Sequence, residues 1–261
     1  MTFYAYILKS DIRQQHEGKK CLIVRDRIAW YKQMGLALNL AKTELIVFGF
    51  TPDCIVIDKL TIPPSQNITY LGVCIQSNLR WDSHINTLCN KLRSSANRIR
   101  VEGRHFGIMD RKKLFSGWCL GQIYSNGLIF LSSATQSELN SIQTAMNSGV
   151  RAIFSLPRYG HVEVSALRSK LLLPSIQTIR SRIMALEAWK RFSSQVDSQA
   201  AIGPITRGRK NKNIPLPDQK GHRGKMFNNM LVKAWNTLPL EIKNQEGKAG
   251  AKREIKKMYA V

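Results

Sequence analysis

The side chains of this sequence that are best suited to a chemical role are basic, and they are concentrated in two stretches of the chain. The first stretch contains Lys91, Arg93, Arg98, Arg100 and Arg104, and the second contains Arg207, Arg209, Lys210 and Lys212. Guanidinium and ammonium groups contact phosphate oxygens and so hold a nucleic acid without reading its bases. The alternative is a solvated helix face and a loop that only promotes solubility. Because few acids lie near residues 91–104, phosphate contact is the favoured interpretation for the first stretch.

The whole chain is strongly basic. Its 261 residues contain 40 Lys+Arg against 17 Asp+Glu, which gives a formal charge of +23. This charge predicts a polyanionic partner, RNA or DNA, and binding that weakens steeply as salt rises. A ribosomal-style or aggregation-prone basic chain is the alternative. An anionic membrane would also attract the chain, but no apolar run approaches the roughly 20 residues of a membrane span, so we expect no transmembrane helix.

Size and cysteine usage predict a globular intracellular protein, nuclear or cytoplasmic. A hydrophobic content of 43% suffices for a packed core in one large or two modest domains. The N-terminal residues lack the features of a signal peptide. The five cysteines are odd in number and form no Cys-x-x-Cys pair, which indicates reduced thiols and argues against structural zinc. No His, Asp and Glu cluster supports a nuclease.

The first 80 residues read as a short helix followed by strands. An apolar stripe predicts a helix over residues 20–34, and Gly35 can close it in the left-handed conformation. Residues 44–48 and 54–57 are apolar and separated by turn formers, which predicts that they pair as a hairpin. Residues 60–62 and 68–75 extend the β-rich region, with a proline loop between them.

The remainder reads as helical. Apolar residues at helical spacing predict helices over residues 83–101, 111–120, 137–154 and 174–192. Asp82 is expected to be the N-cap of the first, and Trp81 and His84 to pack at its start. A glycine- and proline-rich stretch, residues 193–224, is expected to be a surface linker before a closing helical unit. We therefore expect an α+β fold divided into residues 1–80, 81–195 and 196–261.

Several short motifs stand in a fixed order along the chain. Residues Gly35 to Phe48 follow the pattern Gly-Leu-x-Leu-Asn-x-x-Lys-Thr and then an apolar strand. Tyr70-Leu71-Gly72 comes next, then Trp81 with His84-Ile85, then Thr206-Arg207, and finally Trp235-Asn236-Thr237-Leu238-Pro239. Together they resemble the C-terminal part of the reverse transcriptase of non-LTR (LINE or jockey-like) retrotransposons. The resemblance spans nearly all of the chain.

The resemblance implies a small antiparallel sheet at the end of a polymerase palm, followed by a predominantly helical, thumb-like bundle. Lys42 would lie near the triphosphate as a possible general acid, against the alternative of a solvated lysine before a strand. Tyr70, Leu71 and Gly72 would form a primer-grip turn in which glycine lets the backbone approach the nucleic acid. The alternative is a strand aromatic followed by a bulge glycine. The basic residues of the thumb and of the loop would contact an RNA and DNA template-primer.

One part of the family pattern is missing. Family members carry a Tyr-Ala-Asp-Asp box before the Lys-Thr pair, and here that place reads Tyr4-Ala5-Tyr6-Ile7. Polymerases hold two divalent metal ions with such carboxylates, and neither Tyr6 nor Ile7 offers an anionic oxygen at neutral pH. The magnesium that the complete family enzyme needs therefore has no ligands in this motif, and we expect no cofactor in this chain.

Two functions of different classes follow. The first is a fragment of a retrotransposon RNA-directed DNA polymerase that binds template-primer through a basic thumb but does not polymerise. The second is a host-retained, non-enzymatic basic protein that binds RNA or chromatin. An upstream reading frame with the missing box, or many similar copies, would favour the first function, whereas a single locus with introns would favour the second.

Overall fold

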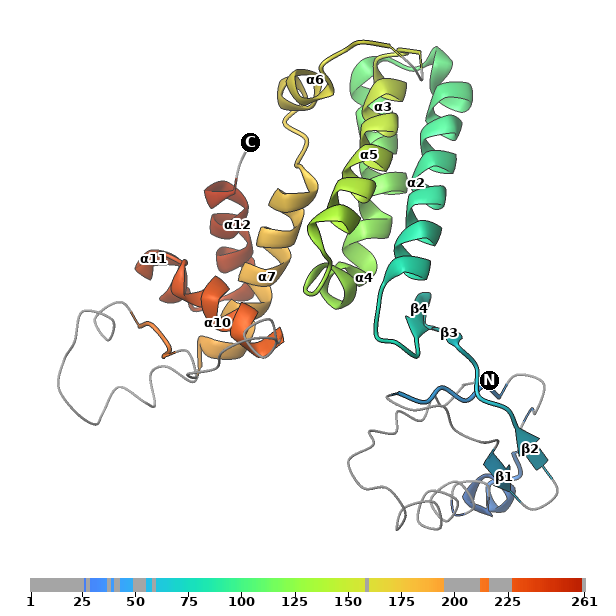
Figure 1. Ribbon diagram of the computed structural model, residues 1–261. Helices are drawn as coiled ribbons and strands as arrows, with labels where there is room; N and C mark the ends of the chain where they lie inside the picture. The colour runs from blue at the N-terminus through green and yellow to red at the C-terminus, as the bar shows by residue number, and fades with distance from the viewer. Residues whose placement is uncertain are drawn as a thin grey trace. The chain divides into compact units, whose positions relative to one another are not determined.

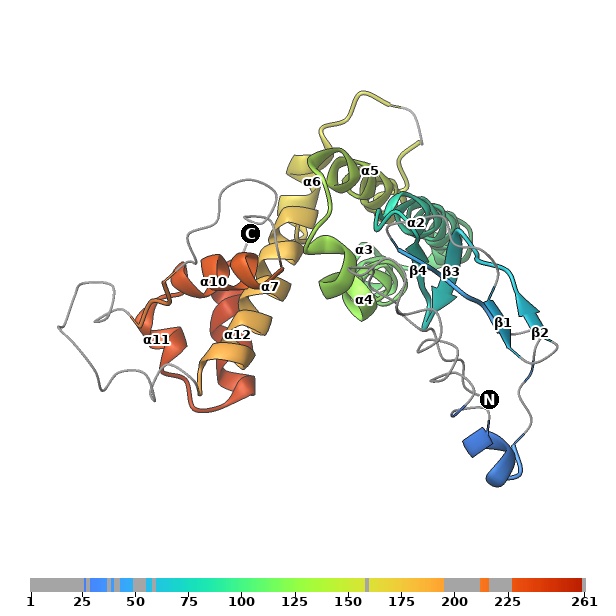
Figure 2. The same ribbon diagram turned by 60° about the horizontal axis from the view of Figure 1, so that its bottom comes forward.

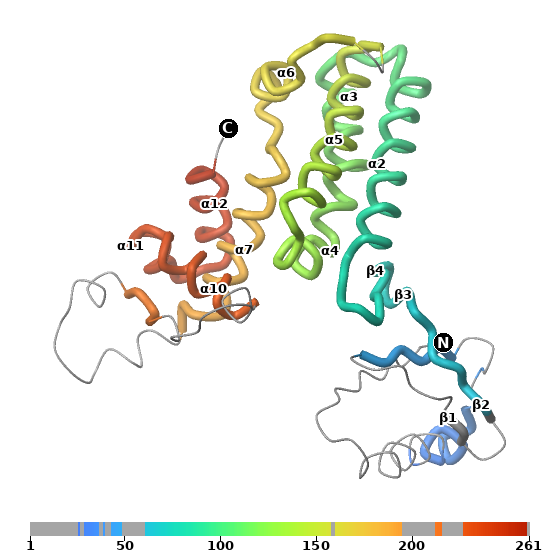
Figure 3. The backbone as a smooth tube through the Cα atoms, in the orientation of Figure 1, coloured from blue at the N-terminus to red at the C-terminus, as the bar shows by residue number. Residues whose placement is uncertain are grey.

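The structure is a computed structural model that describes residues 26, 29–36, 39, 43–48, 55–57, 60–157, 160–194, 212–215 and 227–259 (Figure 1). Its contacts divide the chain into two compact units, Met1–His84 and Ile85–Val261. In the described residues, short antiparallel strands lie in the first unit and helices dominate the second, as the backbone trace in Figure 3 shows. The coarse α+β expectation is confirmed, and the three-part division at residues 80 and 195 stays a prediction.

Gly35 ends the first helical segment as predicted. Its φ is +70°, which glycine adopts without a steric penalty. The amide of Gly35 donates to the carbonyl of Lys32 at 3.1 Å, and the amide of Leu36 donates to that of Tyr31 at 2.8 Å. This pair of bonds is a Schellman motif, which satisfies carbonyls at the end of a helix.

The predicted hairpin between residues 44–48 and 54–57 is wrong in the described residues. Strand β1 (Ile55–Ile57) pairs antiparallel with β2 (Leu60–Ile62), so that Ile57 lies opposite Leu60. Leu45 instead forms a parallel bridge with Pro64, and its carbonyl accepts from the Ser65 amide at 2.7 Å. Two residues separate β1 from β2 along the chain, and a link of that length favours a tight antiparallel turn.

Strands β3 (Asn67–Tyr70) and β4 (Val73–Gln76) form a second hairpin, with Tyr70 opposite Val73. Side chains alternate between the two faces of a strand. Ile68 is buried against Ile46 and Phe48, and Ile75 packs on the same small cluster. The hairpin thus has one apolar face that is held by the segment of residues 45–48.

Helix α2 (Asp82–Glu102) follows β4 and begins one residue earlier than predicted. Asp82 is therefore the first helical residue. The Ser83 amide donates a hydrogen bond to Oε1 of the Gln76 side chain at 3.0 Å. His84 is buried, its Nδ1 accepts from the Cys74 amide at 3.3 Å, and its ring meets Trp81 edge to face. Trp81 and His84 are packing residues, as expected.

After the 3₁₀ turn η2 (Gly103–His105), the chain forms one long helical stretch. It consists of α3 (Ile108–Phe115), the π-helical turn η3 (Ser116–Leu120) and α4 (Gly121–Leu131). The predicted helix over residues 111–120 covers most of α3 and η3 but none of α4. The Trp118 carbonyl in η3 accepts from the Gln122 side chain at 2.6 Å and from the Ser95 hydroxyl of α2 at 3.4 Å.

Helix α5 (Gln136–Ile153) begins with a capping box, in which the Thr135 hydroxyl accepts from the Glu138 amide and the Glu138 carboxylate accepts from the Thr135 amide. Such boxes satisfy the free amides of a first turn. A short α6 (Val164–Lys170) and a longer α7 (Ile176–Phe192) follow. Helices α5 and α7 match the predicted helices closely.

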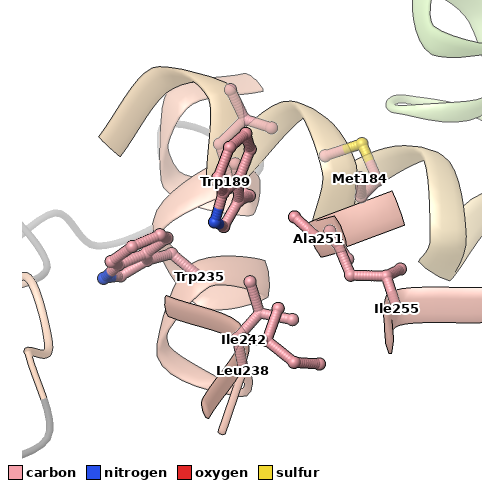
Figure 4. Close-up of a cluster of buried hydrophobic side chains, with 10 residues drawn as sticks. Met184, Trp189, Trp235, Leu238, Ile242, Ala251 and Ile255 are labelled. Carbon is pink, nitrogen blue, oxygen red and sulfur yellow. The ribbon is translucent and has the colours of Figure 1, made fainter. Parts of the chain in front are cut away.

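Helices α10 (Phe227–Asn236), α11 (Leu240–Lys243) and α12 (Lys248–Met258) form the closing unit. Helices α10 and α12 pack along α7, as both views show (Figures 1 and 2). Their shared core contains Met184, Ala188, Trp189, Trp235 and Ile255 (Figure 4). Trp235 is fully buried and Leu238 nearly so, and both side chains anchor the closing helices in this core.

Candidate nucleic-acid interface

The turn of the second hairpin presents the motif predicted to grip a primer. Leu71 and Gly72 are its two central residues, with φ of +49° and +81°. Positive φ at both positions is the signature of a type I′ turn, the connection that matches the twist of paired strands. Gly72 is therefore a turn residue, and the alternative of a bulge glycine is wrong.

The left-handed backbone conformation of Leu71 in this turn costs free energy. A residue with a Cβ loses roughly 1–2 kcal/mol in the left-handed conformation, and Asn or Gly would fit there better. Yet the Leu71 side chain is 78% exposed, and the neighbouring Tyr70 is 40% exposed. The turn thus displays two apolar side chains that gain little from the core of their own unit.

Helix α2 divides its basic residues between two flanks. Residues seven positions apart lie on one face of a helix, so Lys91 shares a face with Arg98, and Arg93 shares a different face with Arg100. Leu88, Leu92 and Ile99 lie between the two flanks and are buried. The spacing of the four cations therefore places them on both sides of the apolar stripe, and they do not share one face.

Arg98 is held on its flank by two neighbours. Its guanidinium lies 4.4 Å from the centre of the Trp118 ring and forms an ion pair with Glu102 at 3.1 Å. Stacking on Trp and an exposed ion pair each stabilise a guanidinium modestly. Arg98 is thus oriented in advance, although Glu102 offsets part of its charge.

Arg100 serves the fold rather than an open surface. It is half-buried, and its Nη2 donates to the Leu156 carbonyl at 3.3 Å. Arg111 donates to the Ile153 carbonyl at 3.0 Å and to the Ser155 hydroxyl. Arg111 thereby binds the last carbonyl of α5, where carbonyls lack helical partners and cations are favoured. Arg100 binds a carbonyl three residues beyond that end. The prediction that Arg100 tracks phosphates is not supported by this position.

Lys91, Arg93 and Arg104 have exposed side chains. Arg93 donates to Asn90 within α2 at 3.3 Å, and Arg104 donates to the neighbouring His105 at 2.8 Å. Contacts this local leave the guanidinium groups at the surface. Lys91 and Arg93 are therefore the cations of α2 whose geometry best suits a phosphate.

Lys212 is held through its backbone. It lies in the short described segment of residues 212–215, where its carbonyl accepts from the Trp235 indole at 2.6 Å. Four other predicted site residues lie outside the described residues, namely Lys42, Arg207, Arg209 and Lys210. Their predicted roles stay predictions.

Two of the described thiols, Cys89 and Cys119, are not set up for nucleophilic chemistry. Burial raises the pKa of Cys119 to about 12, and it also raises the pKa of Cys89, where the Arg93 guanidinium partly opposes the effect. A thiol attacks as its thiolate, so these two groups are inert near neutral pH. Cys74, Cys89 and Cys119 are free, as expected for reduced cysteines.

No metal centre is formed by the part of the chain that the structure describes, because no three His, Cys, Asp or Glu side chains come together there. The positions aligned with the family's carboxylates, Tyr6 and Ile7, lie outside that part. The donor set of the described residues therefore does not fit the magnesium pair of a polymerase. None of the described helices is long and apolar enough to cross a lipid bilayer.

No family model, curated protein or solved structure matches this chain. The likeness to non-LTR reverse transcriptases therefore stays a prediction carried by the sequence motifs.

Two features of this region were not predicted. The first is the pair of arginines at the end of α5, because a pairing across more than 40 residues leaves no local signal. The second is the charge of α12, which has five basic residues and one acid. The run Lys-Arg-Glu-Ile-Lys-Lys at residues 252–257 could have identified it.

Proposed function

We propose that this chain binds the RNA–DNA template-primer duplex in the manner of the palm end and thumb of a non-LTR reverse transcriptase, and that it does not polymerise by itself. The observation that supports this function best is the exposed Leu71 in a left-handed turn. Backbone strain of this kind persists where the surrounding structure imposes it, and it gathers at ligand-binding sites. An apolar side chain beside Gly72 suits the sugar faces of a nucleic acid.

Helix α2 supplies the electrostatic part of the proposed binding. Lys91 and Arg93 are exposed and would each contact a phosphate. Arg98, stacked on Trp118, would assist on the Lys91 flank. These contacts carry no base information, so we expect binding that is insensitive to sequence and sensitive to salt.

Polymerisation requires carboxylates that hold two metal ions. The motif where the family has them offers Tyr6 and Ile7. The proposed activity is therefore binding alone, and primer extension by this chain is not expected.

The turn is tested by Leu71→Gly, with Leu172→Gly as its matched control. Leu172 is also a leucine with positive φ, +52°, and is 69% exposed at the end of α6. Both variants relieve the same backbone strain, so both should raise thermal stability by about 1 kcal/mol. Only Leu71→Gly should weaken the affinity for a fluorescent RNA–DNA hybrid, by about fivefold, because it removes an apolar contact worth about 1 kcal/mol.

Equal affinities for the two glycine variants would contradict the role of the turn. The α2 contacts are tested in the same assay with Lys91→Gln/Arg93→Gln, which should reduce the slope of log affinity against log salt by about 2. Lys113→Gln/Lys190→Gln is the charge-matched control, since both lysines already pair with acids. If both double variants behave alike, α2 does not contact the phosphates.

A further inference from the structure

We infer that helix α12 is a second phosphate-binding surface, which holds the backbone of a nucleic-acid duplex independently of α2. Its exposed cations are Lys248, Lys252, Arg253, Lys256 and Lys257. This inference goes beyond the proposed function and depends on it only for the choice of partner.

The orientation of α12 is fixed by its apolar side. Ala251 and Ile255 are buried, at 0% and 2% exposure, in the core shared with α7 and α10 (Figure 4). Lys252 and Lys256 each follow one of these residues, about 100° further round the helix. The packing therefore turns the cations away from the core and toward solvent.

One row of lysines on α12 has no acid of the helix to pair with. Glu254 is the single acid in residues 248–258, and it lies 2.9 Å from Lys257 and 3.7 Å from Arg253. Lys248, Lys252 and Lys256 are spaced four residues apart, so neighbours along the row repel each other and destabilise the free helix. A bound polyanion would relieve this repulsion.

The length of the row fits a phosphate backbone. Eight residues of helix separate Lys248 from Lys256, a rise of about 12 Å. One strand of a B-form duplex presents about three phosphates over such a distance. The three lysines therefore match in number the phosphates that one strand offers over this distance.

The chemistry of α12 favours a duplex over the other polyanions. A membrane-binding helix must insert its apolar face, but that face is occupied here by α7 and α10. Proteins that bind single strands stack bases on aromatic side chains, and residues 248–258 contain none. Backbone contact with a duplex needs only the cations.

The test is a salt titration of the full chain with a fluorescent RNA–DNA hybrid, comparing wild type with Lys248→Gln/Lys252→Gln/Lys256→Gln. Glutamine keeps a helix propensity close to that of lysine. We expect the salt slope to fall by about 3 and the affinity at low salt to weaken by at least roughly tenfold. Lys113→Gln/Lys170→Gln/Lys233→Gln is the control, because it removes the same charge from other exposed positions. Its affinity and its salt slope should change much less than those of the α12 variant.

Two further measurements separate the outcomes. Circular dichroism of both triple variants checks that the helices persist, and amide hydrogen exchange of wild type should slow in residues 248–258 when the duplex is added. The inference would be overturned if the two triple variants lost affinity and salt slope equally. It would also be overturned if amide exchange in α12 did not slow when the duplex is added. An α12-dependent preference for single strands or for anionic lipid vesicles would overturn it as well.

The outcomes for α2 and α12 are independent of each other. A loss in the α12 variant together with a normal Lys91→Gln/Arg93→Gln variant would support this inference and contradict the α2 part of the proposed function. A loss in the Lys91→Gln/Arg93→Gln variant together with a normal α12 variant would support the α2 part of the proposed function and contradict this inference. A wild-type chain that fails to bind the hybrid at low salt would overturn both.

Discussion

Asn236 and Ile214 are joined by two hydrogen bonds that run in opposite directions. The Ile214 amide donates to Oδ1 of Asn236 at 2.9 Å, and Nδ2 of Asn236 donates to the Ile214 carbonyl at 2.9 Å. The adjacent Trp235 donates its indole N–H to the Lys212 carbonyl. The Trp-Asn pair of the closing motif therefore binds the backbone of residues 212–214 to α10.

This pairing predicts that Asn236→Asp destabilises the protein. A carboxylate keeps the shape of the amide but cannot donate to the Ile214 carbonyl, so one hydrogen bond is replaced by repulsion between two acceptors. We expect the free energy of unfolding to fall by about 1–3 kcal/mol, measured by urea unfolding. Thr237→Ala, which removes an exposed contact next door, should change it by less than about 0.5 kcal/mol. Equal effects of the two substitutions would contradict the role of Asn236.

Gly149 of α5 lies against the Phe115 ring of α3. A Cβ at this position would lie 2.5 Å from a ring carbon of Phe115, and the Phe115 side chain is fully buried. Gly149→Ala should therefore force the two helices apart and destabilise the protein by about 2–3 kcal/mol. The measurement is the same urea titration.

Gly121→Ala is the control for this substitution. Gly121 also lies in a helix, but the nearest atom to its added Cβ is 4.0 Å away. Alanine should there stabilise the helix by up to about 1 kcal/mol. A Gly149→Ala variant as stable as wild type would show that α3 and α5 do not pack this closely.

Lys243 gives the stability a dependence on pH. Burial lowers the pKa of Lys243 to about 8, from 10.5 for an ordinary lysine. Its Nζ donates to Asn213 at 2.8 Å and lies 5.4 Å from the centre of the Trp235 ring. Between pH 8 and 10.5 the unfolded chain keeps this proton while the folded chain loses it. The free energy of unfolding contributed by Lys243 therefore rises with pH across that window.

The prediction is tested with Lys243→Met, whose side chain cannot be protonated. The stability of wild type relative to this variant should increase between pH 8 and pH 10.5. The raised pKa of Cys119 acts in the opposite direction above pH 9, but Cys119 is present in both proteins, so its effect cancels in the comparison. Parallel stability curves for the two proteins would refute the effect.

The sequence predicts the helices best where one apolar stripe faces a core. In α5, Leu139, Ile142 and Met146 recur at helical spacing and are fully buried. Helix α4 escaped prediction because residues 121–131 are apolar on most sides and contain two glycines, so no stripe stands out. The pairing of strands between residues 44 and 64 was harder to predict. It depends on which segment each strand pairs with in the folded chain, and the composition of a segment does not specify its partner.

The candidate site was predicted in part. The Tyr70 to Gly72 turn could be identified from its residues, whereas its left-handed Leu71 depends on the register of β3 and β4. The roles of the cations depend on tertiary partners. Arg98 stacks on Trp118, and Arg100 binds a carbonyl more than 50 residues away along the chain. Basic residues of one helix therefore differ in whether they remain available to contact a phosphate.

The most direct test of nucleic-acid binding is the salt dependence of the wild-type affinity for an RNA–DNA template-primer, measured beside primer extension with magnesium and manganese. We predict a linear fall of log affinity with log salt, with a slope steeper than about −3, and no extension of the primer. Failure to bind at low salt would contradict the proposed function. Extension would contradict the proposal that this chain does not polymerise, and it would require carboxylates other than those sought at Tyr6 and Ile7.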